Sequence, residues 1–207
     1  MRKYLFAVAL ATAAATPALA QDTAPFSGLR VEGLVGYDTT DVEGENSDGV
    51  TYGAQVGYDV QSSGAVFGVE GEIADSTVDE CVQDLDLAGD ELCVSAGRDL
   101  YVGGRAGAAV SPNVLVYGKA GYTNARFNYI GGDGTTDYSQ NLDTDGLRLG
   151  AGVEQKFGAM TFGKIEYRYS NYKEGEVDFE ATGVADSDRF DIDTDRHQVV
   201  ASVGVRF

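Results

Sequence analysis

The chain has 207 residues and a formal net charge of -18, with 33 acidic residues against 15 basic ones. A chain this acidic lacks the basic footprint that binds phosphate backbones, so we expect no nucleic acid partner. Glycine is abundant and tryptophan is absent. Beyond the N-terminus, no stretch reaches the roughly 18 apolar residues of a membrane-spanning helix.

The first 20 residues have the layout of a secretory signal peptide. Arg2 and Lys3 precede an apolar, alanine-rich run, and Ala18-Leu19-Ala20 supplies the small residues of a cleavage site. We therefore predict a signal peptide over residues 1–20 and a single mature domain over residues 21–207.

The mature chain alternates apolar and polar residues with the period of two that is typical of β-strands. At the C-terminus, Val199, Val203 and Phe207 fall on one parity, whereas Ser202 and Arg206 fall on the other. Eight such stretches occur, over residues 27–38, 50–60, 65–73, 99–110, 114–123, 146–157, 162–172 and 199–207.

The connections between these stretches alternate between short and long. Tight turns are expected near residues 61–64, 111–113 and 158–160. The long polar segments, which hold 25 of the 33 acidic residues, are 38–50, 75–97, 124–145 and 171–195. Short turns at one end and long loops at the other are the rule in transmembrane β-barrels. The pattern predicts an all-β fold, a closed eight-stranded antiparallel up-and-down barrel with four acidic loops.

Three features predict that the apolar parity faces outward, towards lipid. The polar parity is rich in glycine and charge, which suits the crowded interior of a narrow barrel. Aromatic residues lie near strand ends on the apolar parity, as in membrane-interface girdles: Tyr37, Tyr52, Tyr122, Tyr169 and Phe207. Charges on the polar parity can also pair. A soluble barrel with the apolar parity inside is the alternative.

The turn positions predict which interior residues face one another. Glu154 is expected opposite Lys164, and Gln55 opposite Glu70. Arg105 and Lys119 are expected side by side, so acidic partners such as Glu70, Glu72 or Glu154 must lie nearby, because an unpaired buried charge is costly. The predicted interior charge network consists of Arg30, Glu32, Glu70, Glu72, Arg105, Lys119, Arg148, Glu154, Lys164, Glu166 and Arg168.

Lipid offers no partner to backbone N–H and C=O groups, so the last strand of such a barrel must pair with the first. The stretches GAGVEQKF, IEYRYSNY and HQVVASVGVRF resemble strands of the Gram-negative outer-membrane barrel family of opacity-type and OmpA/OmpX-like proteins. The resemblance implies an eight-stranded barrel whose terminal residues Val203, Val205 and Phe207 are read by the barrel-assembly machinery. It also implies termini in the periplasm and long loops outside the cell. No peptidoglycan-binding domain is expected.

Cys81 and Cys93 are the only cysteines, and secretion would expose them to an oxidising compartment. We predict a disulfide, worth roughly 3 kcal/mol in the chain-entropy model; free thiols and a metal site are the alternatives.

The acidic segments are candidates for binding Ca²⁺ or Mg²⁺, which take oxygen ligands. However, DIDTD at 191–195 lacks the glycine of an EF-hand loop. A solvated surface is the simpler interpretation, with cation bridging to lipopolysaccharide as the alternative.

The expected partners are outer-membrane lipid, lipopolysaccharide and the barrel-assembly machinery. No enzyme activity, cofactor or resident metal is predicted. His197 shares the outward parity with Val199, away from Ser202, so a nucleophile–base pair is not expected. The leading function is a structural or cell-surface interaction role with a filled lumen. A narrow or gated porin-like channel is the runner-up, followed by a soluble periplasmic ligand-binding barrel.

Overall fold

A computed structural model describes residues 24–42, 45–77, 79–83, 91–132, 137–179 and 190–207. These residues form one continuous antiparallel sheet with the order β3-β2-β1-β9-β8-β7-β6-β5-β4. The strands are β1 (Gly28–Val42), β2 (Glu45–Ser62), β3 (Ala65–Ser76), β4 (Asp79–Gln83), β5 (Glu91–Ser111), β6 (Val114–Gly132), β7 (Asp137–Lys156), β8 (Thr161–Phe179) and β9 (Phe190–Arg206).

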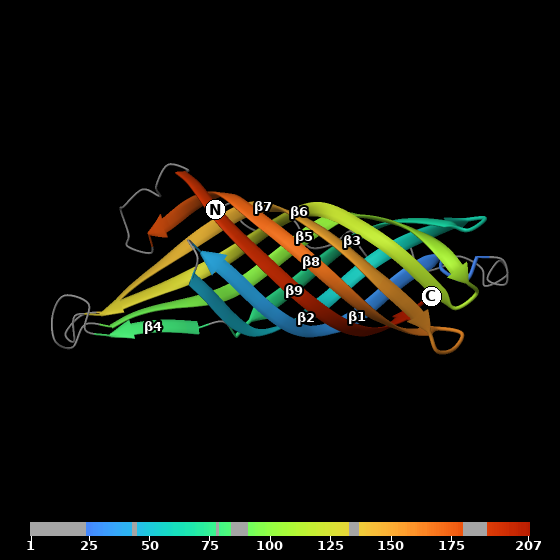
Figure 1. Ribbon diagram of the computed structural model, residues 1–207, viewed down its shortest axis with the longest axis horizontal. Helices are drawn as coiled ribbons and strands as arrows, with labels where there is room; N and C mark the ends of the chain where they lie inside the picture. The colour runs from blue at the N-terminus through green and yellow to red at the C-terminus, as the bar shows by residue number, and fades with distance from the viewer. Residues whose placement is uncertain (1–23, 43–44, 78, 84–90, 133–136, 180–189) are drawn as a thin grey trace, which may run out of the picture.

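The sheet closes into a barrel because β3 also pairs with β5. Strands β3 and β4 both lie against β5, one after the other, so they occupy one of eight positions around the wall. Figure 1 shows the closed, tilted wall, with β1 beside β9. The predicted eight-stranded, antiparallel, closed barrel is confirmed.

The strand register defines the tilt of the wall. Following paired residues once around the barrel from Val31 on β1 leads back to Asp41 on the same strand, ten residues further on. Eight strands with this stagger give an interior just wide enough for side chains to fill. The lumen of such a barrel must therefore be packed with side chains. The identity of these side chains determines whether the interior is apolar or charged.

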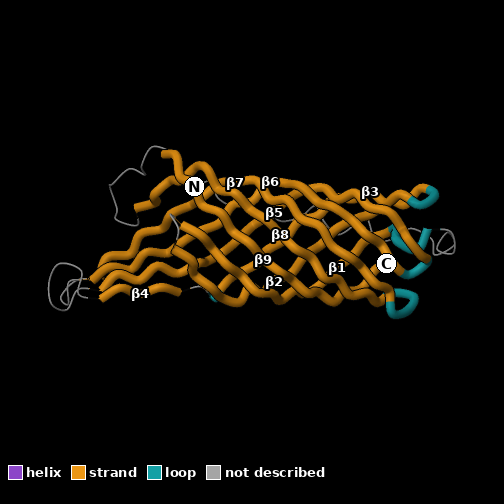
Figure 2. The backbone as a smooth tube through the Cα atoms, viewed as in Figure 1, coloured by secondary structure: helices purple, strands orange, loops and turns teal. Residues whose placement is uncertain are grey.

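Tight turns gather at one end of the barrel, where Figure 2 shows them in teal. The predicted pairs Glu154–Lys164 and Arg105–Lys119 are confirmed by the register. The predicted pair Gln55–Glu70 is wrong, because Gln55 pairs with Glu72. The turn between β2 and β3 is centred one residue later than expected, with Ser63 in the left-handed region (φ 57°).

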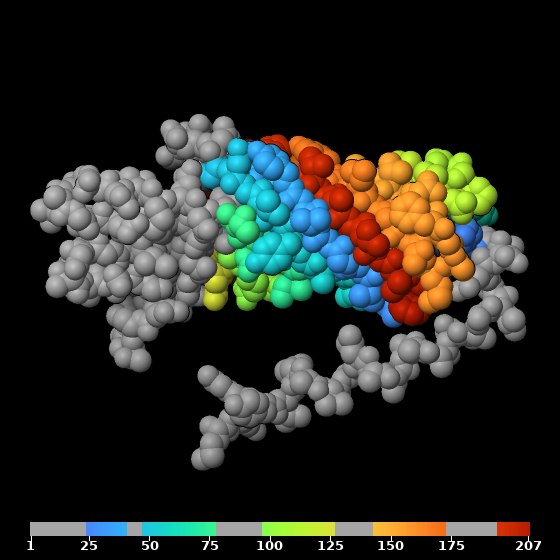
Figure 3. Space-filling model, turned by 90° about the horizontal axis from the view of Figure 1, so that it is seen from below, coloured from blue at the N-terminus to red at the C-terminus, as the bar shows by residue number. Residues whose placement is uncertain are grey.

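Side-chain burial alternates, in the sense that we predicted, along the strand residues whose side chains the structure describes. On β9, Val203 is 69% exposed, whereas its neighbour Ser202 is 7% exposed and Arg206 is 4% exposed. Apolar side chains such as that of Val203 cover the outside of the wall. Figure 3 shows this outer surface, on which β1, β2 and β9 form adjacent diagonal stripes. An outward apolar face and an inward charged face exclude the soluble-barrel alternative. Within the described residues, no helix is long and apolar enough to span a membrane.

The strands are much longer than the outward apolar band. On β1 this band covers the nine residues from Leu29 to Tyr37, and on β9 and the residue after it the band covers the nine from Val199 to Phe207. Nine to eleven residues of a tilted strand span a bilayer. Strand pairing nevertheless continues beyond the band at the end opposite the tight turns, so much of what we expected to be long loops is strand. The expectation of long loops was wrong because backbone ladders do not require apolar side chains.

Candidate functional site: an ion-paired lumen

The lumen holds equal numbers of buried cations and anions. Each has at most 6% of its surface exposed. The eight cations are Arg30, Arg105, Lys119, Arg148, Lys164, Arg168, Arg196 and Arg206; the eight anions are Glu32, Asp38, Asp59, Glu70, Glu72, Asp99, Glu154 and Glu166. The described interior is therefore formally neutral, and the net acidity of the chain lies elsewhere.

Asp59 on β2 is the centre of the first cluster, nearest the tight turns. Its carboxylate accepts hydrogen bonds from Arg30 Nε at 3.0 Å, Arg105 Nε at 2.8 Å and Arg206 Nη1 at 2.7 Å. Glu154 closes the cluster by accepting from Arg105 at 3.0 Å and from Arg206 at 2.7 Å. Two carboxylates thus hold three guanidinium groups from three different strands.

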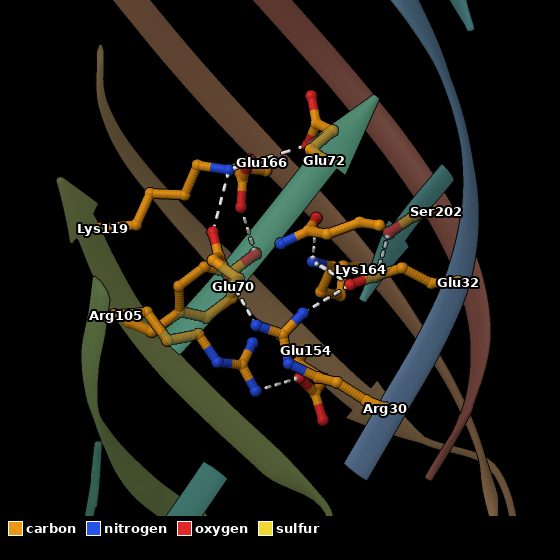
Figure 4. Close-up of polar contacts among 12 residues, drawn as sticks. Arg30, Glu32, Glu70, Glu72, Arg105, Lys119, Glu154, Lys164, Glu166 and Ser202 are labelled. Atoms are coloured by element: carbon orange, nitrogen blue, oxygen red, sulfur yellow. Dashed lines mark hydrogen bonds and ion pairs between the residues drawn. The ribbon is translucent and has the colours of Figure 1, made fainter. Parts of the chain in front are cut away.

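The second cluster fills the middle of the lumen (Figure 4). Lys119 Nζ lies 3.1 Å from Glu70 and 2.9 Å from Glu166, so the cation expected beside Arg105 has acidic partners of its own. Across the lumen, Lys164 Nζ donates to Glu32 at 2.8 Å. Two further contacts extend the cluster: Ser202 donates to Glu32, and Arg168 donates to Glu72.

The third cluster lies towards the long-strand end. Asp99 on β5 accepts hydrogen bonds from Arg148, Arg196 and, at 2.9 Å, the Thr123 hydroxyl. Arg196 also donates through Nε to Asp38 at 2.8 Å, and Asp38 accepts from Ser76. Contacts therefore cross the whole lumen from β9 to β5. Such paired charges tolerate burial because each has several partners.

Glycine makes room for these long side chains at specific points. A Cβ on Gly57 would lie 2.6 Å from Arg30 Nη2, inside the guanidinium contact. A Cβ on Gly103 would lie 2.1 Å from the Tyr101 hydroxyl. The glycines on the polar parity are thus explained by packing, as the narrow interior predicts.

A short segment closes the lumen at the tight-turn end. We call residues 24–27 the N-terminal stopper. Phe26 is fully buried against Val66, Leu115 and Tyr117. The segment is fastened by hydrogen bonds from Arg206 to the Phe26 carbonyl (2.7 Å), from Lys156 to the Pro25 carbonyl (2.8 Å) and from the Phe26 amide to Gln61 (3.0 Å). No sequence signal pointed to this stopper.

The structure buries all eleven residues of the predicted charge network and joins each to an oppositely charged partner. Sequence reasoning omitted five members: Asp38, Asp59, Asp99, Arg196 and Arg206. Strand parity alone would have placed Asp59 and Arg206 inside. Arg196 was missed because it adjoins an acidic segment that we expected to be a loop.

Cys81 and Cys93 are directly opposed on paired strands β4 and β5, a placement compatible with a cross-strand disulfide. Their side chains lie outside the described residues, so the disulfide stays a prediction.

Many of the acidic residues lie outside the described part of the chain, and the residues that are described contain no group of three or more side chains that could hold a metal ion. Residues 191–195 belong to strand β9, which is not the loop of an EF-hand.

The residues of the expected assembly signal line the outside of β9. Val203 and Phe207 are exposed on the outer face, and Val205 is partly buried between them. The Phe207 amide donates to the Leu29 carbonyl at 2.8 Å, so the last residue joins the first strand. His197 also faces outward, and its Nδ1 lies 2.7 Å from the Tyr167 hydroxyl.

Comparison with known proteins agrees with this architecture. Residues 6–207 match the family described as the outer membrane protein beta-barrel domain. A 22 kDa outer membrane protein of Rhizobium leguminosarum bv. viciae is 31% identical over 183 residues, which cover 84% of this chain and 76% of that protein.

Two solved structures share the fold at low sequence identity. The crystal structure of Neisserial surface protein A has a TM-score of 0.54 at 13% identity, covering 87% of this chain and 98% of that one. The outer membrane protein OprG of Pseudomonas aeruginosa has a TM-score of 0.50 at 13% identity, covering 87% and 97%. With its apolar wall and its match over residues 6–207, this chain belongs to the outer membrane protein beta-barrel domain family and is an integral β-barrel protein of the bacterial outer membrane.

Proposed function

We propose that this protein is a closed structural barrel that presents an acidic extension at the cell surface. The acidic extension is the part of the strands that continues beyond the apolar band at the end opposite the tight turns. The observation that carries the proposal is the burial of the lumen's ion pairs. Arg30, Asp59 and Glu154, in the cluster nearest the tight turns, are completely inaccessible to solvent. Residues that line a water-filled pore would be wet, so a constitutive porin-like channel is not supported.

The proposed orientation places the tight turns and both ends of the mature chain in the periplasm. The long-strand end would then face the exterior, as is usual for bacterial outer-membrane barrels. We further propose that residues 1–20 are removed as a signal peptide, leaving residues 21–207 as the barrel domain. Protease treatment of intact cells tests the orientation: cuts are expected in segments 38–50, 75–97, 124–145 and 171–195, and cuts confined to disrupted cells would contradict it.

The proposed partners follow from this placement. The barrel-assembly machinery would insert the chain through its last strand, and lipid and lipopolysaccharide would surround the wall. The acidic extension would meet a surface ligand or divalent cations. We propose no catalytic role: His197 contacts Tyr167 and lies beside Tyr169, with the two rings tilted by 44° and their centroids 5.2 Å apart, in a wall of outward-facing residues.

Conductance in a planar bilayer is the experiment that tests the closed lumen. The purified protein should insert without producing stable channels, because three layers of buried ion pairs and the stopper fill its interior. The double variant Arg30→Ala/Asp59→Ala provides the contrast, since it removes two paired side chains from the cluster nearest the tight turns. A stable open channel in the wild-type protein would refute the proposal and favour the pore.

A further inference from the structure

Two arginines form an unusual patch on the outside of the barrel, which we call the arginine pair. Arg98 is on β5 and Arg126 is on β6. The guanidinium of Arg126 donates to both carboxylate oxygens of Asp143, at 2.9 and 2.7 Å, and this bidentate contact fixes its position. Arg98 Nη2 donates to Asn124 at 3.1 Å and lies 3.7 Å from Asp143. Both arginines are therefore held side by side over one carboxylate.

The arginine pair lies immediately beyond the aromatic girdle. Tyr122 is 48% exposed on the outward face of β6, two residues before Asn124 and four before Arg126. On β5, Arg98 is two residues beyond Leu100, the last large apolar residue in this direction that the described side chains of the strand show as exposed. Interfacial tyrosines mark the level of the lipid head groups, so the guanidinium groups lie at or just above that level.

The charges around the rest of the wall give the arginine pair its significance. Arg98 and Arg126 are the only cations that the described part of the chain places on the outside of the wall beyond the girdle. The outward charged residues on other strands at this level, such as Asp48 and Asp195, are acidic. The side chains of Arg98 and Arg126 are 42% and 33% exposed, so both guanidinium groups can be reached from outside the wall. Asp143 and Asp145 offset the two arginine charges, so this part of the wall is close to neutral and repels an anionic head group less than the acidic strands do.

We propose that Arg98 and Arg126 bind a phosphate group of lipopolysaccharide in the outer leaflet. The planar arginine fork matches phosphate oxygens and gives strong, charge-assisted hydrogen bonds. Asp143 accepts from Nε and Nη2 of Arg126 and so orients that guanidinium group, and Asn124 holds Arg98 against β6. The inference rests on the proposed orientation, which places this end of the barrel in the leaflet that contains lipopolysaccharide.

Binding of purified lipopolysaccharide to the full barrel in neutral detergent tests this site. Wild-type protein, Arg98→Gln/Arg126→Gln and the charge-retaining Arg98→Lys/Arg126→Lys are compared, with Asp48→Asn as the control on another face. We expect affinity to fall about tenfold or more in the glutamine variant, as loss of charged hydrogen bonds predicts. The lysine variant should bind with intermediate affinity, and Asp48→Asn should bind at least as well as the wild type.

Three outcomes would overturn the site. Equal binding by the glutamine variant would show that the arginines make no contribution. Binding that EDTA abolishes equally in all variants would assign recognition to cation bridging by acidic groups. Equal, arginine-dependent binding of phosphatidylglycerol or dephosphorylated lipopolysaccharide would exclude the proposed ligand. Heat-modifiable gel mobility and protease shaving are measured on every variant, so a misfolded or inverted barrel is distinguished from a folded barrel that lacks the site.

Discussion

At the scale of single residues, Asp59 shows how a buried charge becomes essential through its position. It accepts from guanidinium groups on β1, β5 and β9, so one carboxylate connects strands that are 29 to 147 residues apart in sequence. Each of these partners is itself buried. Removing Asp59 therefore affects three cations at once, which is the situation in which a buried ion pair matters most.

Asp59→Ala should lower the free energy of unfolding by about 3–5 kcal/mol, the range for breaking a buried pair. Urea unfolding of the refolded barrel in lipid vesicles, followed by circular dichroism, measures this change. Asp48→Ala is the matched control, because Asp48 is exposed and its hydrogen bond to Thr39 lies on the outside. Similar unfolding midpoints for the two variants would contradict the hub role of Asp59.

Gly28 is the second residue with a specific structural role. It has a φ of 119°, and an added Cβ would lie 1.9 Å from the Phe207 carbonyl oxygen. Gly28→Ala should destabilise the barrel by about 1–3 kcal/mol or more from backbone strain alone. Gly33→Ala is the control, because a Cβ there meets nothing within 4 Å. The same urea titration applies, and equal effects at the two glycines would refute this account of the β1–β9 seam.

At the scale of elements, the ends of the strands distinguish this barrel from a minimal one. The β1–β9 seam is reinforced beyond its ladder by the N-terminal stopper, since Arg206 of β9 donates to the Phe26 carbonyl. Phe26 in turn packs against Val66 of β3 and Leu115 of β6. The stopper therefore ties the two terminal strands to the opposite side of the wall.

Phe26→Ala should remove about 3 kcal/mol of stability or more, the usual range for a buried phenylalanine. Phe26→Leu should recover most of the loss, because it keeps an apolar side chain in the same place. Thermal unfolding on heat-modifiability gels compares the two variants with the wild type. If Phe26→Ala melts like the wild type, the stopper does not contribute to the closed state.

Sequence patterns predicted some elements well and others poorly, for identifiable physical reasons. Parity placed Arg105 and Lys119 inside and in register, because a two-residue period leaves no other choice once one face meets lipid. Parity could not specify the Ser63 turn, whose one-residue displacement moved the partner of Gln55. It also could not reveal where strands end, because pairing continued through acidic stretches such as the start of β9 and so concealed Arg196.

At the scale of the whole molecule, charge is separated by compartment. The lumen balances eight cations against eight anions, so the net charge of -18 is carried by the rest of the chain. Neutrality inside removes the need for counterions and permits dense packing. The acidic residues outside the lumen keep the extension solvated and repel anionic surfaces. On the described wall, the arginine pair is the exception to this acidic surface.

The central claim is that the barrel has an apolar outer face and an interior filled with side chains. A spin-label scan along β9 in lipid vesicles tests this claim most directly. Labels at Val199, Ala201 and Val203 should be accessible to oxygen dissolved in the bilayer. Labels at Val200 and Ser202 should be shielded both from oxygen and from a water-soluble nickel reagent. Alternation of this kind is the predicted result; water-soluble reagent reaching Val200 and Ser202 freely, or no alternation at all, would contradict the account.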